Sequence, residues 1–260
     1  MAWKRCYHRR GSLGHLQQWR LQGPSPNDFN FKFYKKFWEL MKHDLFIMAL
    51  EFFKRGKLLK GINTSYIALI PKVAGNSSFN DYRPISLLSG LYKILATKLK
   101  ELMWCVVSPS QSAFIVGRNI LDSVLIANEM LDSMKSRSCQ GFFLKLDFRK
   151  AFDIVSWSYL NDVMGYMKFG ARWRKWIMAC VSTIRLSVLI NGSPTPEFVV
   201  SSGLRQGDPF SHFLFCLAAE GISVFISRSL KIGALYGMDS ASVKAIHHLQ
   251  FADDTLFFTK

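Results

Sequence analysis

The sequence predicts an α+β fold, with an antiparallel sheet that carries helices on one face. Three observations support this prediction. Strand-like and helix-like stretches interleave without strict βαβ repetition, the last two strand-like runs flank a tight acidic turn, and 49% of the residues are hydrophobic. A chain of 260 residues with 22 Phe can bury a substantial core, so its composition excludes a disordered protein.

The first part of the chain begins with a basic arm. Residues 1–26 contain five Lys or Arg and no acid, which fits an organelle transit peptide, a basic arm or an adventitious start upstream of a truncated domain. After the turn-forming stretch 23–27, apolar residues spaced three and four apart over 38–52 predict an amphipathic helix that ends near Gly56. Residues 65–70 then predict a strand.

The middle of the chain is mainly helical. Asn119 and Ser156 are candidate N-caps, because their side chains can accept a hydrogen bond from the first turn of a helix. The spacing of apolar residues predicts helices over 89–104, 119–134, 157–167 and 172–182. It also predicts one strand, over 142–147.

The last part of the chain combines hairpins with a long helix. Asn191-Gly192 is a strong turn signal between strands predicted over 185–190 and 197–200. Pro209 opens a long apolar helix towards Leu230, since proline is tolerated in the first turn. Two final strand-like runs, 248–251 and 255–258, enclose an acidic turn.

The charge balance points to a polyanionic partner. The chain has 34 Lys and Arg against 18 Asp and Glu, a formal net charge of +16. Nucleic acid is the commonest partner of so basic a protein, although an anionic membrane surface or a ribosome-associated role would give the same balance. No apolar run reaches 18 residues, so a membrane span is not expected.

The cysteines predict a reducing compartment. The chain has five, widely spaced and without a C-x-x-C pair, so neither a disulfide framework nor a zinc site is predicted, and the thiols are expected to be buried. The nucleus or cytoplasm is the expected location, and the basic N-terminus leaves import into an organelle open.

Three acids occur where strand propensity would not place them. Asp147 ends one apolar run, and Asp253-Asp254 lies between two others, so their carboxylates are expected at the edge of a core. Carboxylates crowded in this way suit Mg²⁺, which takes few protein ligands and completes its octahedron with water and phosphate oxygens. The alternative is that the adjacent acids simply form a hairpin turn.

Several motifs in register give the sequence a family resemblance. They are F-A-D-D at 251–254, D-F-R-K-A-F-D at 147–153, G-L-R-Q-G-D-P at 203–209, D-Y-R-P-I-S-L at 81–87, Q-S-A-F at 111–114 and N-G-S-P at 191–194. In this order they resemble the reverse transcriptases of non-LTR (LINE-type) retrotransposons, which are abundant in plant genomes. The resemblance runs from about Phe29 to Lys260.

The resemblance implies a right-hand polymerase without its thumb. It divides the chain into the arm at 1–26, the fingers and the start of the palm at 27–135, and the palm at 136–260, truncated after the acidic hairpin. The implied activity is RNA-directed DNA polymerisation, with an RNA template, a DNA primer and deoxynucleoside triphosphates as partners. The alternatives are a catalytically inactive remnant that binds nucleic acid by charge and a scaffold without biochemical activity.

The resemblance also assigns roles to individual residues. Asp147, Asp253 and Asp254 match the aspartates that bind two Mg²⁺ ions, for which Mn²⁺ is a substitute. Phe152 matches the ring that excludes a 2′-hydroxyl, and the alternative is that it is a core residue. The other matched positions are Lys72, Arg83, Gln206 and Gly207 for the nucleotide and Arg205 and Ala252 for nucleic acid.

Two qualifications come from the same residues. Lys72 and Arg83 could instead be solvated surface charges. After Pro209 the family continues with Leu, Ser and Pro, whereas this chain has Phe210, Ser211 and His212, which could shift the following helix.

Overall fold

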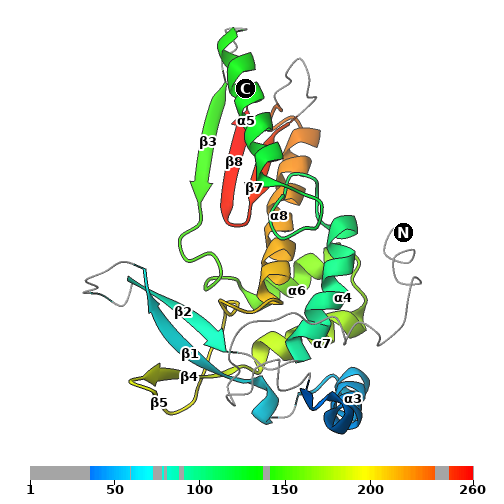
Figure 1. The fold of residues 1–260 in the computed structure, drawn as a ribbon. Helices are drawn as coiled ribbons and strands as arrows, with labels where there is room; N and C mark the ends of the chain where they lie inside the picture. The colour runs from blue at the N-terminus through cyan, green and yellow to red at the C-terminus, as the bar shows by residue number, and fades with distance from the viewer. Residues whose placement is uncertain are drawn as a thin grey trace. The chain divides into compact units, whose positions relative to one another are not determined.

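The fold divides into two compact units, each built from two stretches of chain. The first unit contains the described residues up to Leu99 together with Phe152–Ser211, and the second contains Lys100–Ala151 and His212–Lys260. The basic arm predicted for 1–26 lies outside the described residues. The computed structural model (Figure 1) describes residues 36–58, 60–72, 78, 81–87, 91–136, 141–237 and 246–259.

The first unit is a mixed sheet with helices. The strand order is β2-β1-β4-β5, and β6 also pairs with β4. The β1–β2 pair is antiparallel, but β1 and β4 run parallel, which the sequence did not predict. The elements are α3 (Trp38–Arg55), a 3₁₀ turn (Lys60–Asn63), β1 (Thr64–Pro71), β2 (Tyr82–Leu87), the start of α4 (Leu91–Val106), α6 (Trp157–Tyr166), α7 (Ala171–Ser182), β4 (Arg185–Ile190), β5 (Ser193–Pro194) and β6 (Phe198–Val199).

Local sequence signals place these elements. In α3 the buried residues are Ala49 and Phe52, on the apolar face that the spacing predicted. The helix ends at Gly56, whose φ of 66° is left-handed and whose N–H donates to the carbonyl of Phe52. The predicted cap of α6 is confirmed, because the Ser156 hydroxyl accepts from the N–H of Tyr159.

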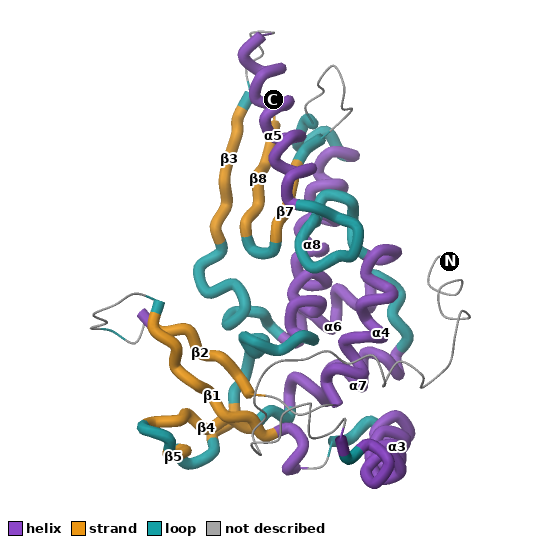
Figure 2. The backbone as a smooth tube through the Cα atoms, viewed as in Figure 1, coloured by secondary structure: helices purple, strands orange, loops and turns teal. Residues whose placement is uncertain are grey.

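The second unit contains a three-stranded antiparallel sheet in the order β3-β8-β7. Figure 2 shows the turn between β7 and β8 at the same end of this sheet as the last residue of β3. Besides the end of α4, the elements are α5 (Ile120–Ser136), β3 (Phe142–Asp147), α8 (Ser211–Lys231), β7 (His248–Phe251) and β8 (Asp254–Thr259).

Helices contact both faces of this sheet. Ala127 and Met130 of α5 form a buried cluster with Leu249 and Phe258. Successive strand residues point to opposite faces, and His248, next to Leu249, is hydrogen-bonded to Ser223 of α8 at 3.0 Å. The α+β class is therefore confirmed, with α5 packed against β7 and α8 hydrogen-bonded to it.

The outer strand of the sheet is more exposed than its sequence suggests. Phe142 and Leu144 of β3 are 72% and 50% exposed, whereas Phe258 of the neighbouring β8 is fully buried. The expectation that each acid lies at the edge of a core therefore fits β8 but not β3. An edge strand has a neighbour on one side only, so its apolar residues gain less burial.

Helix α8 and the cysteines complete the core. By length and hydropathy alone α8 could cross a bilayer, but 61% of its most apolar window is buried within the fold, as is typical of a core helix. Burial raises the pKa of the Cys216 thiol to about 12 and also raises that of Cys180. Cys105 is exposed, so the expectation of buried thiols is wrong for this residue; Cys6 and Cys139 lie outside the described residues.

Candidate active site

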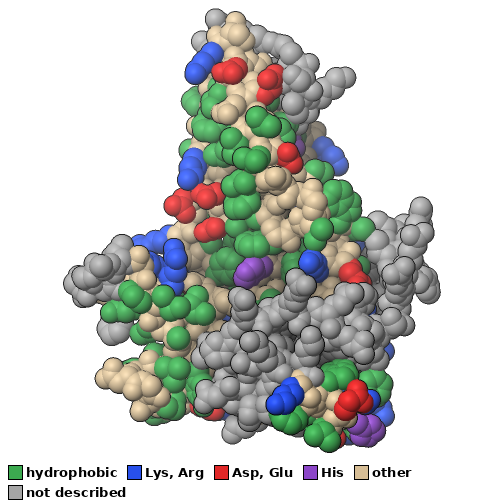
Figure 3. Space-filling view, in the orientation of Figure 1, with side chains coloured by type: hydrophobic (Ala, Val, Ile, Leu, Met, Phe, Trp, Pro, Cys, Tyr) green, Lys and Arg blue, Asp and Glu red, His purple; other side chains and the backbone are tan. Residues whose placement is uncertain are grey.

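The strand register brings the three predicted aspartates together. Asp147 is the direct partner of Asp254 in the antiparallel β3–β8 pair, and Asp253 precedes Asp254 in the two-residue turn between β7 and β8. Directly opposed residues of such a pair share a face, with Cβ atoms about 4.5–5.5 Å apart. Figure 3 shows acidic side chains gathered where β3 and this hairpin end. The three carboxylates therefore form one acidic cluster within the second unit.

These carboxylates are open to solvent. Asp147 and Asp254 are exposed and Asp253 is half-buried. The ammonium of Lys145 lies 3.1 Å from Asp254 Oδ1, and this hydrogen bond raises the pKa of Lys145. Within the described residues no three His, Cys, Asp or Glu side chains form a ready metal cage. The three carboxylates are therefore open to ligands from outside the protein.

The turn that carries Asp253 is held by Gln111, a residue with no role assigned from the sequence. Ala252 has a φ of 55°, which is uncommon for any residue other than glycine. Its N–H donates to Gln111 Oε1 at 3.0 Å, and Gln111 Nε2 donates to its carbonyl at 3.4 Å. The sequence marked Gln111 only as part of the Q-S-A-F motif. The predicted contact of Ala252 with nucleic acid stays a prediction.

The predicted phosphate-binding residues lie on one hairpin of the first unit. Arg83 pairs with Ile70, and the N–H of Lys72 donates to the carbonyl of Asp81 at 2.7 Å. Residue 81 immediately precedes β2 and is two residues from Arg83, so Lys72, which lies opposite residue 81, belongs to the same face of the β1–β2 hairpin as Arg83. Both residues are exposed.

The Gln206-Gly207 turn packs on that same face. The N–H of Ser86 donates to the carbonyl of Gln206 at 2.9 Å. Gly207 has a φ of 86°, and a Cβ there would lie 2.9 Å from Cγ2 of Ile85, which is two residues from Arg83. Glycine is needed at this position for both reasons.

Phe152 lies beside this turn. Its carbonyl accepts from the N–H of Leu204 at 2.8 Å, and the ring is half-buried. Asp153 Oδ1 accepts from Gln206 Nε2 at 3.4 Å. The first unit therefore brings Phe152, the residue predicted to exclude a 2′-hydroxyl, next to the Gln206-Gly207 turn. This turn packs on the hairpin that carries Arg83, so four predicted nucleotide-binding residues lie in one region of the unit.

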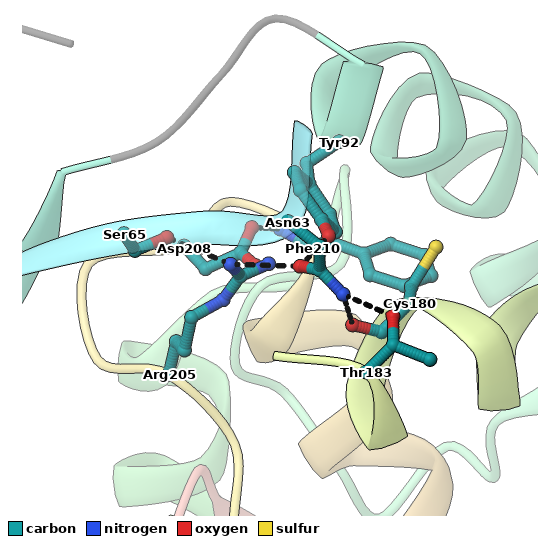
Figure 4. Close-up of polar contacts among 8 residues, drawn as sticks. All are labelled: Asn63, Ser65, Tyr92, Cys180, Thr183, Arg205, Asp208 and Phe210. Atoms are coloured by element: carbon teal, nitrogen blue, oxygen red, sulfur yellow. Dashed lines mark hydrogen bonds and ion pairs between the residues drawn. The ribbon is translucent and has the colours of Figure 1, made fainter. Parts of the chain in front are cut away.

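Arg205 has a different environment from the one predicted. Its guanidinium donates to Asp208 Oδ2 at 3.1 Å and to Ser65 Oγ at 2.9 Å (Figure 4), and it lies 4.1 Å from the centre of the Tyr92 ring. The Arg205 and Asp208 side chains are 5% and 2% exposed. Burial alone would lower the pKa of Arg205, but Tyr92 and Asp208 outweigh it and the pKa is raised.

Further hydrogen bonds extend this cluster through the first unit. Asn63 accepts from Tyr92 and from Arg205, and its amide donates to the Cys180 carbonyl at 3.0 Å and to Thr183 Oγ1 at 2.8 Å. Asp208 Oδ1 also accepts the N–H of Phe210 at 2.8 Å. No exposed guanidinium is therefore available at position 205 for the predicted contact with nucleic acid, and Arg205 instead ties the 203–209 motif to β1 and α7.

Comparison with known proteins agrees with these motifs. A family model described as reverse transcriptase (RNA-dependent DNA polymerase) matches residues 70–260. The transposon TX1 uncharacterized 149 kDa protein of Xenopus laevis is 30% identical over 213 residues, which are 80% of this chain and 16% of that protein. The retrovirus-related Pol polyprotein from the type-1 retrotransposable element R2 of Popillia japonica is 27% identical over 72% of this chain and 26% of its own length.

A solved structure shares the fold. Telomerase from Candida albicans, in complex with a TWJ fragment of telomeric RNA, aligns with a TM-score of 0.51 and 15% identity over 76% of this chain and 38% of that chain. Of the two curated relatives, the chain covers 16% of the length of the TX1 protein and 26% of the length of the R2 protein. It belongs to the reverse transcriptase (RNA-dependent DNA polymerase) family, in the branch of the non-LTR retrotransposons.

Proposed function

We propose that this chain carries the catalytic and nucleotide-binding groups of an RNA-directed DNA polymerase. In the proposed reaction the 3′-hydroxyl of a DNA primer, paired to an RNA template, attacks the α-phosphate of a deoxynucleoside triphosphate and pyrophosphate leaves. One observation carries the proposal: Asp147 and Asp254 are direct cross-strand partners, with Asp253 beside them.

The acidic cluster fits divalent metal ions. It offers hard oxygen ligands at a solvent-exposed sheet end, and Mg²⁺ is usually bound by one or two carboxylates together with water and substrate phosphates. Asp147, Asp253 and Asp254 would hold the ions, and Mn²⁺ would be an acceptable substitute. When bound, such ions activate an attacking oxygen and stabilise a departing one.

The first unit supplies the nucleotide contacts in this proposal. Arg83 can bind phosphate through two N–H groups and Lys72 as a point charge, and their shared face allows both to reach one triphosphate. Gly207 lets the backbone approach the nucleotide closely, and Gln206 offers a donor and an acceptor. Phe152 excludes the 2′-hydroxyl by filling the space below the sugar.

Primer extension tests the proposal. The chain is incubated with an RNA template, a DNA primer, deoxynucleotides and Mg²⁺, beside Asp253→Asn and a control, Asp162→Asn, which removes an exposed acid of α6. We expect extension by the parent and the control but not by Asp253→Asn, because that substitution removes a metal ligand. Equal products from the parent and Asp253→Asn would contradict the proposal.

The net charge of +16 favours a second candidate, an inactive remnant that binds nucleic acid through its charge. That candidate predicts RNA binding that depends on salt and is indifferent to Mg²⁺. Incorporation of a deoxynucleotide by the parent chain that is lost in Asp253→Asn would eliminate it.

A further inference from the structure

The turn at the tip of the β7–β8 hairpin contains an unusual backbone conformation. Only Ala252 and Asp253 lie between the paired residues Phe251 and Asp254. A left-handed φ at a residue with a Cβ costs about 1–2 kcal/mol, so the surrounding structure has to hold it in place. The conformation at Ala252 sets the direction in which the next two residues, Asp253 and Asp254, project.

Gln111 provides that support. Its side chain is fully buried and bonds both polar backbone groups of Ala252. The same Oε1 accepts the N–H of Ala113 at 3.0 Å, so the amide oxygen joins two backbone segments. Because the amide is enclosed, losing these bonds would leave buried polar groups without partners.

The segment that carries Gln111 is itself fixed against β7. Gln111 and Gln250 form a parallel β-bridge. The N–H of Gln250 donates to the carbonyl of Ser110 at 2.7 Å, and the N–H of Ser112 donates to the carbonyl of Gln250 at 2.9 Å. Arg118 donates to the carbonyls of Gln111, Ser108 and Val107 at 2.6, 2.5 and 2.9 Å. The loop that carries Gln111 is therefore held in place by hydrogen bonds to β7 and to Arg118.

We infer that Gln111 is a positioning residue for the acidic hairpin, which acts through the backbone of Ala252 to fix the directions of Asp253 and Asp254. This inference rests on the proposed function for its catalytic consequence. Its structural part, the restraint of Ala252, stands independently of catalysis.

The test compares Gln111→Met, which keeps the length but removes the amide, with Gln250→Met. The control also replaces a buried glutamine of the same bridge, but its side chain contacts Thr255 and Ser223 rather than Ala252. We expect Gln111→Met to lower kcat by about 10- to 100-fold and to raise the Mg²⁺ concentration needed for half-activity by a similar factor, with little change in the KM of the nucleotide. Gln250→Met should lower Tm without changing the Mg²⁺ requirement.

A third variant and a second measurement separate positioning from stability. Gln111→Glu keeps an oxygen that can accept from the Ala252 N–H, and its protonated carboxyl can donate to the Ala252 carbonyl. The activity of this variant relative to the parent should therefore recover as the pH is lowered. Hydrogen exchange of the Ala252 amide should be faster in Gln111→Met than in the parent or in Gln250→Met.

Exchange at Ala252 that is unchanged in Gln111→Met would overturn the inference. A fall in Tm with an unchanged Mg²⁺ requirement would overturn it as well. If the parent itself extends no primer, the proposed function fails, while the exchange measurement still decides whether Gln111 restrains the turn.

Discussion

At the scale of single residues, Arg205 and Asp208 show how a motif residue can serve the fold. The pair is buried, and Arg205 also donates a hydrogen bond to Ser65 of the same unit. Removing one member of such a pair leaves a charge without its counter-ion in a place that water does not reach, whereas removing both does not. The arginine of this motif therefore stabilises the turn from inside.

A double-mutant cycle measures this contribution. Arg205→Met and Asp208→Leu should each lower the free energy of unfolding by about 3–5 kcal/mol, and the double variant should lose much less than the sum of the two. Urea denaturation gives the three values. Additive losses would mean that the two side chains do not act as a pair.

Gly207 and Gly192 offer a matched comparison, because both have a left-handed φ but only Gly207 is crowded. Gly192→Ala should cost about 1–2 kcal/mol of backbone strain. Gly207→Ala should cost about 1–3 kcal/mol more, since its Cβ would meet Ile85. Denaturation midpoints check this prediction, and equal losses in the two variants would show that Ile85 moves aside freely.

At the scale of elements, β7 carries a histidine that has to remain neutral. Burial and the neighbouring His247 lower the pKa of His248 to about 4 from 6.5. Its Nε2 lies 2.9 Å from Ser110 Oγ and 3.0 Å from Ser223 Oγ, so one ring links the loop, β7 and α8. Protonating this ring inside the fold is unfavourable.

The pH dependence of stability follows from that shift. A histidine with a depressed pKa contributes its full stability above about pH 6.5 and loses it as the pH falls towards 4. Between about pH 7 and pH 5 the parent should lose about 2 kcal/mol more than His248→Gln. Urea denaturation at the two pH values checks this, and parallel losses would contradict it.

Most helices and strands could be predicted from the sequence, because their signals are local. The Ser156 cap, the Gly56 stop and the apolar stripe of α3 act within a few residues. The parallel pairing of β1 with β4 and the burial of Arg205 could not be predicted in this way, because both depend on contacts between residues far apart in the chain. The grouping of the three acids was predicted only through the motifs.

At the scale of the whole molecule, the net charge of +16 should dominate affinity for nucleic acid. Neutralising phosphates releases bound counter-ions, so RNA affinity should fall by about 10-fold or more between about 50 and about 200 mM salt. Filter binding or fluorescence anisotropy measures this. Asp253→Asn should show the same salt slope, and affinity that is insensitive to salt would mean that charge does not drive binding.

The strand order has a consequence for synthesis of the protein. A ribosome completes β3 long before its partner β8, so the largely apolar β3 waits unpaired while α6, α7 and α8 are translated. An unpaired apolar strand readily joins the edge of another chain. Transcripts with a stop codon before β8 would therefore yield polypeptides that aggregate and that lack the opposed carboxylates of Asp147 and Asp254.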